Sequence, residues 1–143
     1  MATLKTLCLR VLLGGLLIPL LSGCTSVMRM KIETDPQTNS GAPFTVVVQR
    51  ANPNALPTND YREVSEALFN ASSNSMIVEQ AVILPGQSTF LEIVAPEEEL
   101  LVVYFLFTDP GPRWYFPFQQ PLPADVVIQL KGHEIQRIAA DER

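Results

Sequence analysis

Side chains that could do chemistry are few and scattered along this chain of 143 residues. The single histidine, His133, follows Gly132 in a predicted turn with no second histidine or cysteine beside it to share a metal ion, and we interpret it as a solvated turn residue. Three carboxylates occur together at Glu97–Glu99. We interpret them as a solvated strand edge, with a weak cation site as the alternative. Because no base, orienting group and nucleophile occur together, the sequence predicts no enzyme, no cofactor, no metal site and no small-molecule substrate.

The residues around Cys24 form the most specific pattern in the chain. A positively charged start, the apolar run Val11–Leu21 and two small residues before the cysteine are the parts of a secretory signal. This run is far shorter than the roughly twenty residues that span a bilayer. The segment Leu21–Cys24 (LSGC) resembles the bacterial lipobox, in which the thiol receives a diacylglyceryl group before cleavage. We therefore predict a lipoprotein signal peptide over 1–23 and lipidation of Cys24, with a buried cysteine in an uncleaved helix as the alternative.

The remaining segment, 24–143, has a length typical of one domain. Cys8 lies in the predicted signal peptide, so the mature protein has no thiol for a disulfide. The formal net charge of −5 becomes more negative when the basic signal peptide is removed, which makes nucleic acid an unexpected partner. Attachment to the membrane is therefore expected through acyl chains on Cys24. Because Thr25, and not aspartate, follows the cysteine, the enterobacterial sorting rule predicts the outer membrane, facing the periplasm.

Short apolar runs separated by turn residues predict most of the secondary structure. A helix is expected over Tyr61–Asn70, capped by Asn59 or Asp60. Residues 76–84 fit a strand or a helix. Trp114 is expected to pack inward and its neighbour Tyr115 to be exposed. Strands are predicted over Met28–Glu33, Phe44–Arg50, Ser88–Val94, Leu100–Thr108, Ala124–Leu130 and Glu134–Ile138, and the segment Arg113–Phe118 is aromatic. This pattern predicts an all-β, antiparallel two-sheet β-sandwich with a small helical insertion in a single domain.

The order of these features is similar to that of a known family, the type VI secretion system outer-membrane lipoprotein TssJ. The resemblance covers about residues 24–138. The segments that carry it are the lipobox, Phe44–Arg50 (FTVVVQR), Asp60–Leu68 (DYREVSEAL), Leu84-Pro85-Gly86, Leu100–Gly111 (LLVVYFLFTDPG) and the pair Arg113-Trp114. It implies a transthyretin-like β-sandwich, tethered to the outer membrane, that binds the periplasmic C-terminal region of the inner-membrane protein TssM. The alternative is a pilotin-like or assembly-factor lipoprotein of another envelope complex.

The polar stretch Asp35–Pro43 is the predicted partner-binding loop. It joins the first two predicted strands and is longer than the two to five residues of a hairpin loop, so we expect it to have a function. The family resemblance implies the same role for this loop. A tolerated surface insertion is the alternative, and the loop Asp109–Arg113 is the next candidate for the contact. The predicted contact residues are Asp35, Pro36, Gln37, Thr38, Asn39, Ser40 and Gly41, with Gln37, Thr38 and Asn39 supplying hydrogen bonds at the tip of the loop.

Overall fold

A computed structural model describes residues 25–51, 60–70, 76–96 and 99–141. The predicted lipidation site Cys24, the alternative cap Asn59 and the first two residues of the Glu97–Glu99 run lie outside these ranges. The elements are β1 (Thr25–Thr34), the 3₁₀ helix η1 (Thr38–Gly41), β2 (Phe44–Ala51), α1 (Tyr61–Asn70), β3 (Ile77–Ile83), β4 (Ser88–Pro96), β5 (Leu100–Leu106), β6 (Tyr115–Phe118), β7 (Asp125–Lys131) and β8 (Glu134–Asp141).

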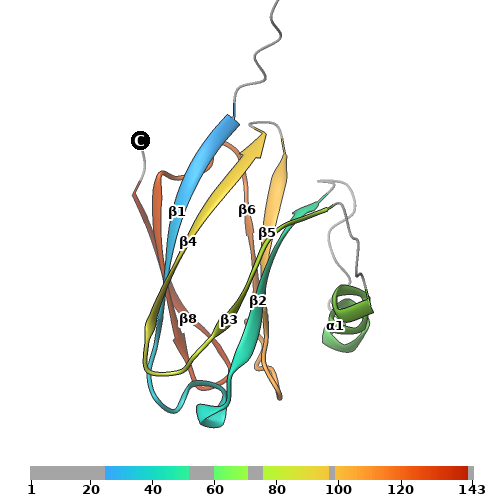
Figure 1. Cartoon of the computed structure of the whole chain (residues 1–143), viewed down its shortest axis with the longest axis vertical. Helices are drawn as coiled ribbons and strands as arrows, with labels where there is room; N and C mark the ends of the chain where they lie inside the picture. The colour runs from blue at the N-terminus through green and yellow to red at the C-terminus, as the bar shows by residue number, and fades with distance from the viewer. Residues whose placement is uncertain (1–24, 52–59, 71–75, 97–98, 142–143) are drawn as a thin grey trace, which may run out of the picture.

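The strands form two four-stranded sheets that pack face to face (Figure 1). One sheet has the order β4-β1-β7-β8 and the other has the order β3-β2-β5-β6. The predicted two-sheet sandwich with a small helix is therefore confirmed. One pairing departs from the expected antiparallel pattern, because β1 and β7 run parallel, with Arg29 opposite Asp125 and Thr34 opposite Leu130. These two strands are separated by most of the chain, so no tight turn fixes their relative direction.

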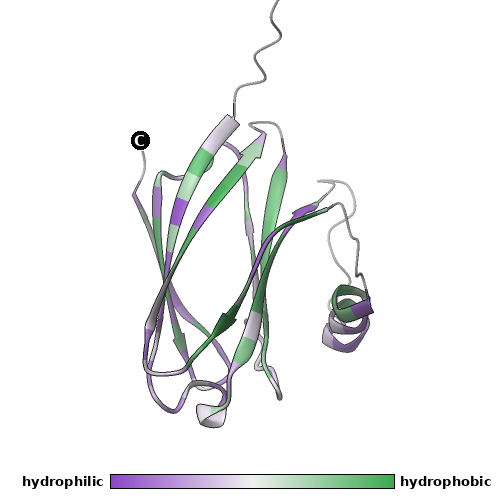
Figure 2. Ribbon diagram, viewed as in Figure 1, coloured by the Kyte–Doolittle hydropathy of each residue, from purple (hydrophilic) through white to green (hydrophobic). Residues whose placement is uncertain are grey.

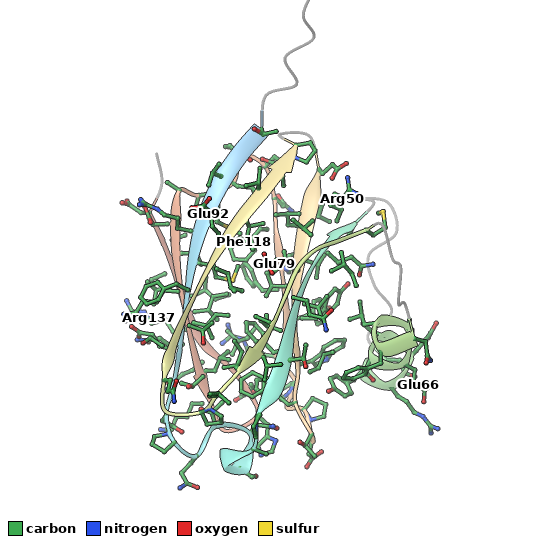
Figure 3. All side chains as sticks on the ribbon, in the orientation of Figure 1. Arg50, Glu66, Glu79, Glu92, Phe118 and Arg137 are labelled. Atoms are coloured by element: carbon green, nitrogen blue, oxygen red, sulfur yellow. The ribbon has the colours of Figure 1, made fainter. Side chains whose placement is uncertain are left out.

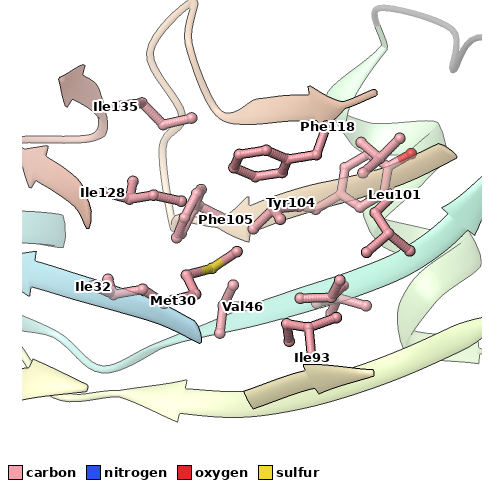
Figure 4. Packing of buried hydrophobic residues seen from close by; sticks show 14 of the residues in the cluster. Met30, Ile32, Val46, Ile93, Leu101, Tyr104, Phe105, Phe118, Ile128 and Ile135 are labelled. Carbon is pink, nitrogen blue, oxygen red and sulfur yellow. The ribbon is translucent and has the colours of Figure 1, made fainter. Parts of the chain in front are cut away.

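The core lies between the two sheets and follows from the alternation of apolar residues. In β1, Met28, Met30 and Ile32 are at most 1% exposed, as the period-2 pattern predicted. Ile93 of β4 and Ile128 of β7 are equally buried. Figure 4 shows the labelled members of this group, such as Met30 and Ile128, meeting residues of the facing sheet. Since a buried aliphatic side chain contributes about 1.5–3 kcal/mol, this layer supplies most of the favourable free energy of folding.

Strand β5 is buried along its whole length. It is an interior strand, paired with β2 on one side and β6 on the other, and all its residues except Tyr104 are hydrophobic on the scale of Figure 2. Phe105 pairs with the core residue Val46, whereas Tyr104 lies on the opposite face of the sheet beside Trp114, with 5.8 Å between the ring centroids. The predicted strand that is buried on both faces is therefore confirmed, although it ends at Leu106 and not at Thr108.

Helix α1 covers the outer face of the β3-β2-β5-β6 sheet (Figure 1). Its bounds match the prediction, and Asp60 is the cap, because its Oδ1 accepts hydrogen bonds from the backbone N–H groups of Arg62 and Glu63. The Tyr61 ring stands edge-on to Trp114 at 4.9 Å, and its hydroxyl donates to the carbonyl oxygen of Phe107. Among the described residues, no helix is both long and apolar enough to cross a bilayer.

The structure tests the predictions for Trp114 and Tyr115 and resolves the assignment of residues 76–84. Trp114 is buried, as expected. Tyr115 is half-buried and not exposed, because its ring lies against Trp114 at 4.9 Å. The ambiguous segment 76–84 contains a strand, β3, which pairs antiparallel with β2.

Candidate partner-binding surface

Four connections meet at the end of the sandwich opposite Thr25, and we call this end the distal surface (Figure 1). They are the β1–β2 connection that contains η1, the β3–β4 turn at Pro85-Gly86, the β5–β6 loop Asp109–Arg113 and the β7–β8 turn at Gly132-His133. The predicted partner-binding loop is therefore as far from Thr25 as this domain allows.

The β1–β2 connection is not a hairpin loop, since β1 and β2 belong to different sheets. Packed sheets lie about 10 Å apart, so the chain must cross that distance between Thr34 and Phe44. The length of this connection thus has a structural cause. The argument that the length of this connection alone indicates a function was therefore wrong. Only its exposed residues can support a role in partner binding.

Thr38 and Asn39 are buried, with 0% and 1% of their surface exposed. The Asn39 side chain has a full set of partners: Oδ1 accepts from the N–H of Thr108 at 2.8 Å, and Nδ2 donates to the carbonyl oxygens of Ala42 at 3.0 Å and Pro43 at 3.4 Å. The Thr38 hydroxyl contacts Asp35 and the carbonyl oxygen of a β7 residue. The expectation that these two side chains are exposed at the tip of the loop was wrong, because they hold the loop to the domain.

Asp35 supports the same turn from its other side. Its Oδ1 accepts from the N–H of Gln37 at 2.9 Å and from the Thr38 hydroxyl at 3.2 Å. The backbone then turns through left-handed conformations at Asn39 (φ 52°), Ser40 (φ 56°) and Gly41 (φ 77°). Glycine tolerates this conformation without a penalty, whereas serine does so at a cost of about 1 kcal/mol.

The exposed part of the predicted loop is smaller than the sequence suggested. Of the seven predicted contact residues, four are exposed, namely Pro36, Gln37, Ser40 and Gly41. The Gln37 side chain makes no hydrogen bond among the described residues, so its amide is available to a partner.

His133 lies next to Ser40 on the distal surface. The Ser40 hydroxyl and His133 Nε2 are 3.1 Å apart, and the imidazole centroid is 6.3 Å from the Phe107 ring. His133 is therefore half-buried between two connections and not a solvated turn residue. Its Nδ1 is buried without a hydrogen-bond partner in the described part of the chain. No three metal-ligating side chains come together in that part of the chain.

The loop Asp109–Arg113 is fixed to the same surface. The N–H of Gly111 donates to the carbonyl oxygen of His133 at 2.8 Å, and the N–H of Ile135 donates to the carbonyl oxygen of Arg113 at 2.7 Å. A side chain at Gly111 would meet Glu134 at 3.1 Å, which explains the glycine there. The two alternative contact loops of the sequence analysis are thus parts of one surface, with the exposed side chains of Asp109 and Arg113 adding one charge of each sign.

A groove that the sequence did not predict runs between β6 and β8. Its volume is about 1070 Å³, and it extends from Arg113 near the distal surface to Ser26 near the start of β1. The apolar side chains that line it include Phe116, Phe118, Leu122, Ile138 and Ala140. No residue pattern indicated this groove, because its walls come from edge strands of different sheets.

Comparisons with known proteins agree with this fold. The sequence profile of the family described as "IglE, N-terminal domain" matches residues 45–130, which extend from β2 to β7. No curated protein matches the sequence. Among solved structures, the T6SS lipoprotein TssJ1 from Pseudomonas aeruginosa is 17% identical, with a TM-score of 0.56 over 84% of this chain and 99% of that chain. Lip from Serratia marcescens, a membrane-bound component of the type VI secretion system, is 14% identical, with a TM-score of 0.61 over 84% of this chain and 100% of that chain.

A third match comes from a structure of the T6SS protein TssM C-terminal domain from EAEC. The matching chain is 17% identical, with a TM-score of 0.57 over 78% of this chain and 99% of that chain. At these identities the matches show the fold alone. They confirm the structural resemblance to TssJ over most of the chain, which the sequence had suggested.

Proposed function

This chain belongs to the family of the IglE N-terminal domain, and we propose that it is the outer-membrane lipoprotein of a type VI secretion membrane complex. In this proposal, acyl chains on Cys24 hold it in the periplasmic leaflet of the outer membrane. Its distal surface binds the periplasmic C-terminal region of a TssM-like inner-membrane protein. The protein is then a structural anchor and catalyses no reaction.

The observation that carries the proposal is the fold shared with two type VI secretion lipoproteins over 84% of the chain. The geometry is compatible with membrane attachment at one end of the domain and partner binding at the other. Strand β1 starts one residue after Cys24 and is ten residues long, which corresponds to about 33 Å at 3.3 Å per residue. A partner bound at the distal surface would therefore lie about 30 Å from the anchored end, on the side that faces away from the membrane.

The first experiment tests the anchor. Replacing Cys24 by serine should yield a folded protein in the soluble periplasmic fraction, because the sandwich core contains no cysteine while attachment needs the acyl chains. Fractionation of cells that lack the partner measures this directly. Recovery of the Cys24→Ser protein with the membranes would refute lipid attachment at this residue.

The second experiment tests the distal surface in a pull-down with the periplasmic domain of the TssM-like protein. Gln37→Arg and Ser40→Arg change exposed residues of the loop and should weaken binding by about tenfold each, as expected for contacts near the centre of an interface. Gln119→Arg is the matched control, an exposed glutamine outside the four distal connections.

The outcomes separate the two parts of the proposal. Equal binding by all three variants would place the contact away from the exposed part of the η1 connection. Complete lack of binding by the lipidated parent protein would refute the TssM-like partner and favour a lipoprotein of another envelope complex.

A further inference from the structure

The sandwich has four edge strands, and three of them carry features that block further strand pairing. Edge strands expose unpaired N–H and C=O groups, and proteins protect them with bulges, prolines, charges or short length. Strand β6 has only four residues and contains Pro117. Strand β3 has an irregularity in its register with β2 near Val48, and β8 has one in its register with β7 near Gln129. These three edges are poor templates for another strand.

The fourth edge strand, β4, is the least protected of the four. It is nine residues long, and all nine pair with β1 without a register shift. Its only proline is Pro96, the last residue, and it contains no lysine. Within the described part of the chain, β1 is its only hydrogen-bonded neighbour strand. A long, regular and unprotected edge of this kind is a ready template for strand addition.

The outer face of β4 presents apolar side chains on both sides of an acid. Phe90 is 72% exposed and Val94 is 50% exposed, and Glu92 lies between them in the sequence on the same face of the strand. Glu92 is labelled in Figure 3. Isolated exposed apolar residues are common, but two on one face of one unprotected edge strand indicate an interaction site.

The carboxylate of Glu92 has no ion-pair partner among the described residues. Arg29 is its neighbour across the β1–β4 ladder, but the Arg29 guanidinium bonds to Asp125 at 2.8 Å. Lys31, the other nearby cation of β1, is 2.6 Å from Glu33 and lies over the Phe90 ring at 5.8 Å. Among the described residues, the edge therefore offers at its centre a carboxylate that forms no ion pair.

We propose that β4 is a docking edge for an extended strand of another protein, which presents apolar, basic and apolar side chains at alternate positions opposite Val94, Glu92 and Phe90. Backbone hydrogen bonds to the free edge supply affinity, and the three side-chain pairs supply specificity. Opposite charges directly across a ladder stabilise a sheet, whereas like charges destabilise it. This surface is separate from the distal surface and does not depend on the role proposed for that surface.

A second copy of this chain fits the edge poorly. Antiparallel pairing of β4 with itself, in the register that sets Phe90 against Val94, places Glu92 opposite Glu92 of the other copy. Two carboxylates facing each other across a ladder repel. The charge at the centre of β4 thus favours a basic partner strand over self-association.

Two synthetic peptides test the proposal on the Cys24→Ser mature protein. Each is a capped nine-residue strand that alternates threonine with a second residue, and the central residues of the recognition face are Ile-Lys-Ile in one and Ile-Glu-Ile in the other. Fluorescence anisotropy should show the lysine peptide binding about tenfold more tightly than the glutamate peptide. Glu92→Lys should reverse that preference, which also shows that the variant protein is folded.

Two further variants locate the site. Phe90→Lys should weaken binding of the lysine peptide by about tenfold, because the change removes an apolar contact and adds a positive charge that repels the lysine. Val82→Lys is the matched control, an exposed apolar residue on the irregular edge β3, and should leave binding unchanged.

Three results would overturn the proposal. They are the absence of binding by the lysine peptide at millimolar concentration, equal binding of both peptides to the parent protein, and no effect of Phe90→Lys. In addition, a concentration-dependent dimer in sedimentation experiments that disappears with Phe90→Lys would make a second copy the occupant, contrary to the proposal.

Discussion

Replacing Asn39 by alanine is the sharpest test of the conclusion that this residue holds the distal surface together. The change removes the acceptor of the Thr108 N–H, at 2.8 Å, and the donor of two bonds to the carbonyl oxygens of Ala42 and Pro43. Because Asn39 is only 1% exposed, water cannot readily replace its side chain. Alanine must also adopt the left-handed backbone conformation, with φ at 52°.

The expected loss of stability follows from these contacts. Each of the two shorter hydrogen bonds contributes about 1 kcal/mol, and the 3.4 Å contact contributes less. The left-handed conformation adds about 1 kcal/mol for alanine. We therefore expect Asn39→Ala to lower the free energy of unfolding by about 3 kcal/mol, a large part of the roughly 5–15 kcal/mol of a typical domain.

Urea denaturation with linear extrapolation measures this change, provided that the slope of the transition stays constant. Asn39→Gly is the informative companion, because it removes the same hydrogen bonds without the backbone penalty and should be about 1 kcal/mol less destabilising than alanine. A loss below about 0.5 kcal/mol for Asn39→Ala would refute the assigned structural role. Equal losses for the two variants would refute the contribution of the left-handed backbone.

Two other predictions concern the β3-β2-β5-β6 sheet. Phe105→Asp should abolish the native fold in circular dichroism and size-exclusion measurements, since it places an unpaired charge at a site with 0% exposure, whereas Val82→Asp at a 63% exposed site should leave the fold intact. Burial raises the pKa of Tyr104 from 10.0 to about 12, with a smaller contribution from the charge of Tyr115. The unfolded chain then loses this proton first, so stability attributable to Tyr104 is complete below pH 10 and falls between pH 10 and 12. Tyr104→Phe should flatten the alkaline part of the stability curve measured by urea denaturation, and an unchanged slope would contradict the assignment.

The parts of the fold that depend on local patterns were predictable. The bounds of α1 followed from its apolar spacing and from the capping residue Asp60. The alternation in β1 and the continuous apolar run of β5 identified a strand buried on one face and a strand buried on both. The parallel pairing of β1 with β7 was missed, because strand neighbours distant in sequence leave no trace in the periodicity of either strand.

The candidate site was predictable only as a region. Polar residues between two strands indicate a loop, and on composition alone each of them is expected to be exposed. Thr38 and Asn39 are buried because their partners come from Leu130 and Thr108, which are 92 and 69 residues away in the sequence. Spatial neighbours at that separation are absent from any local pattern. The sequence also could not show that the η1 connection and the loop Asp109–Arg113 adjoin. For that reason the two loops were considered as alternative sites of partner contact.

The position of β1 explains how this sandwich would carry load between an anchor and a partner. The strand continues directly from the predicted lipidation site and is internal to its sheet, with nine residue pairs to β4 and six to β7. Load applied along β1 is therefore shared as shear between two ladders, whose hydrogen bonds must break together. An edge strand under the same load would be held by one ladder only. At the far end, the buried side chains of Thr38 and Asn39 tie the η1 connection to β7 and to the loop after β5. A partner that binds the exposed residues Gln37 and Ser40 thus pulls on both sheets and not on a free loop.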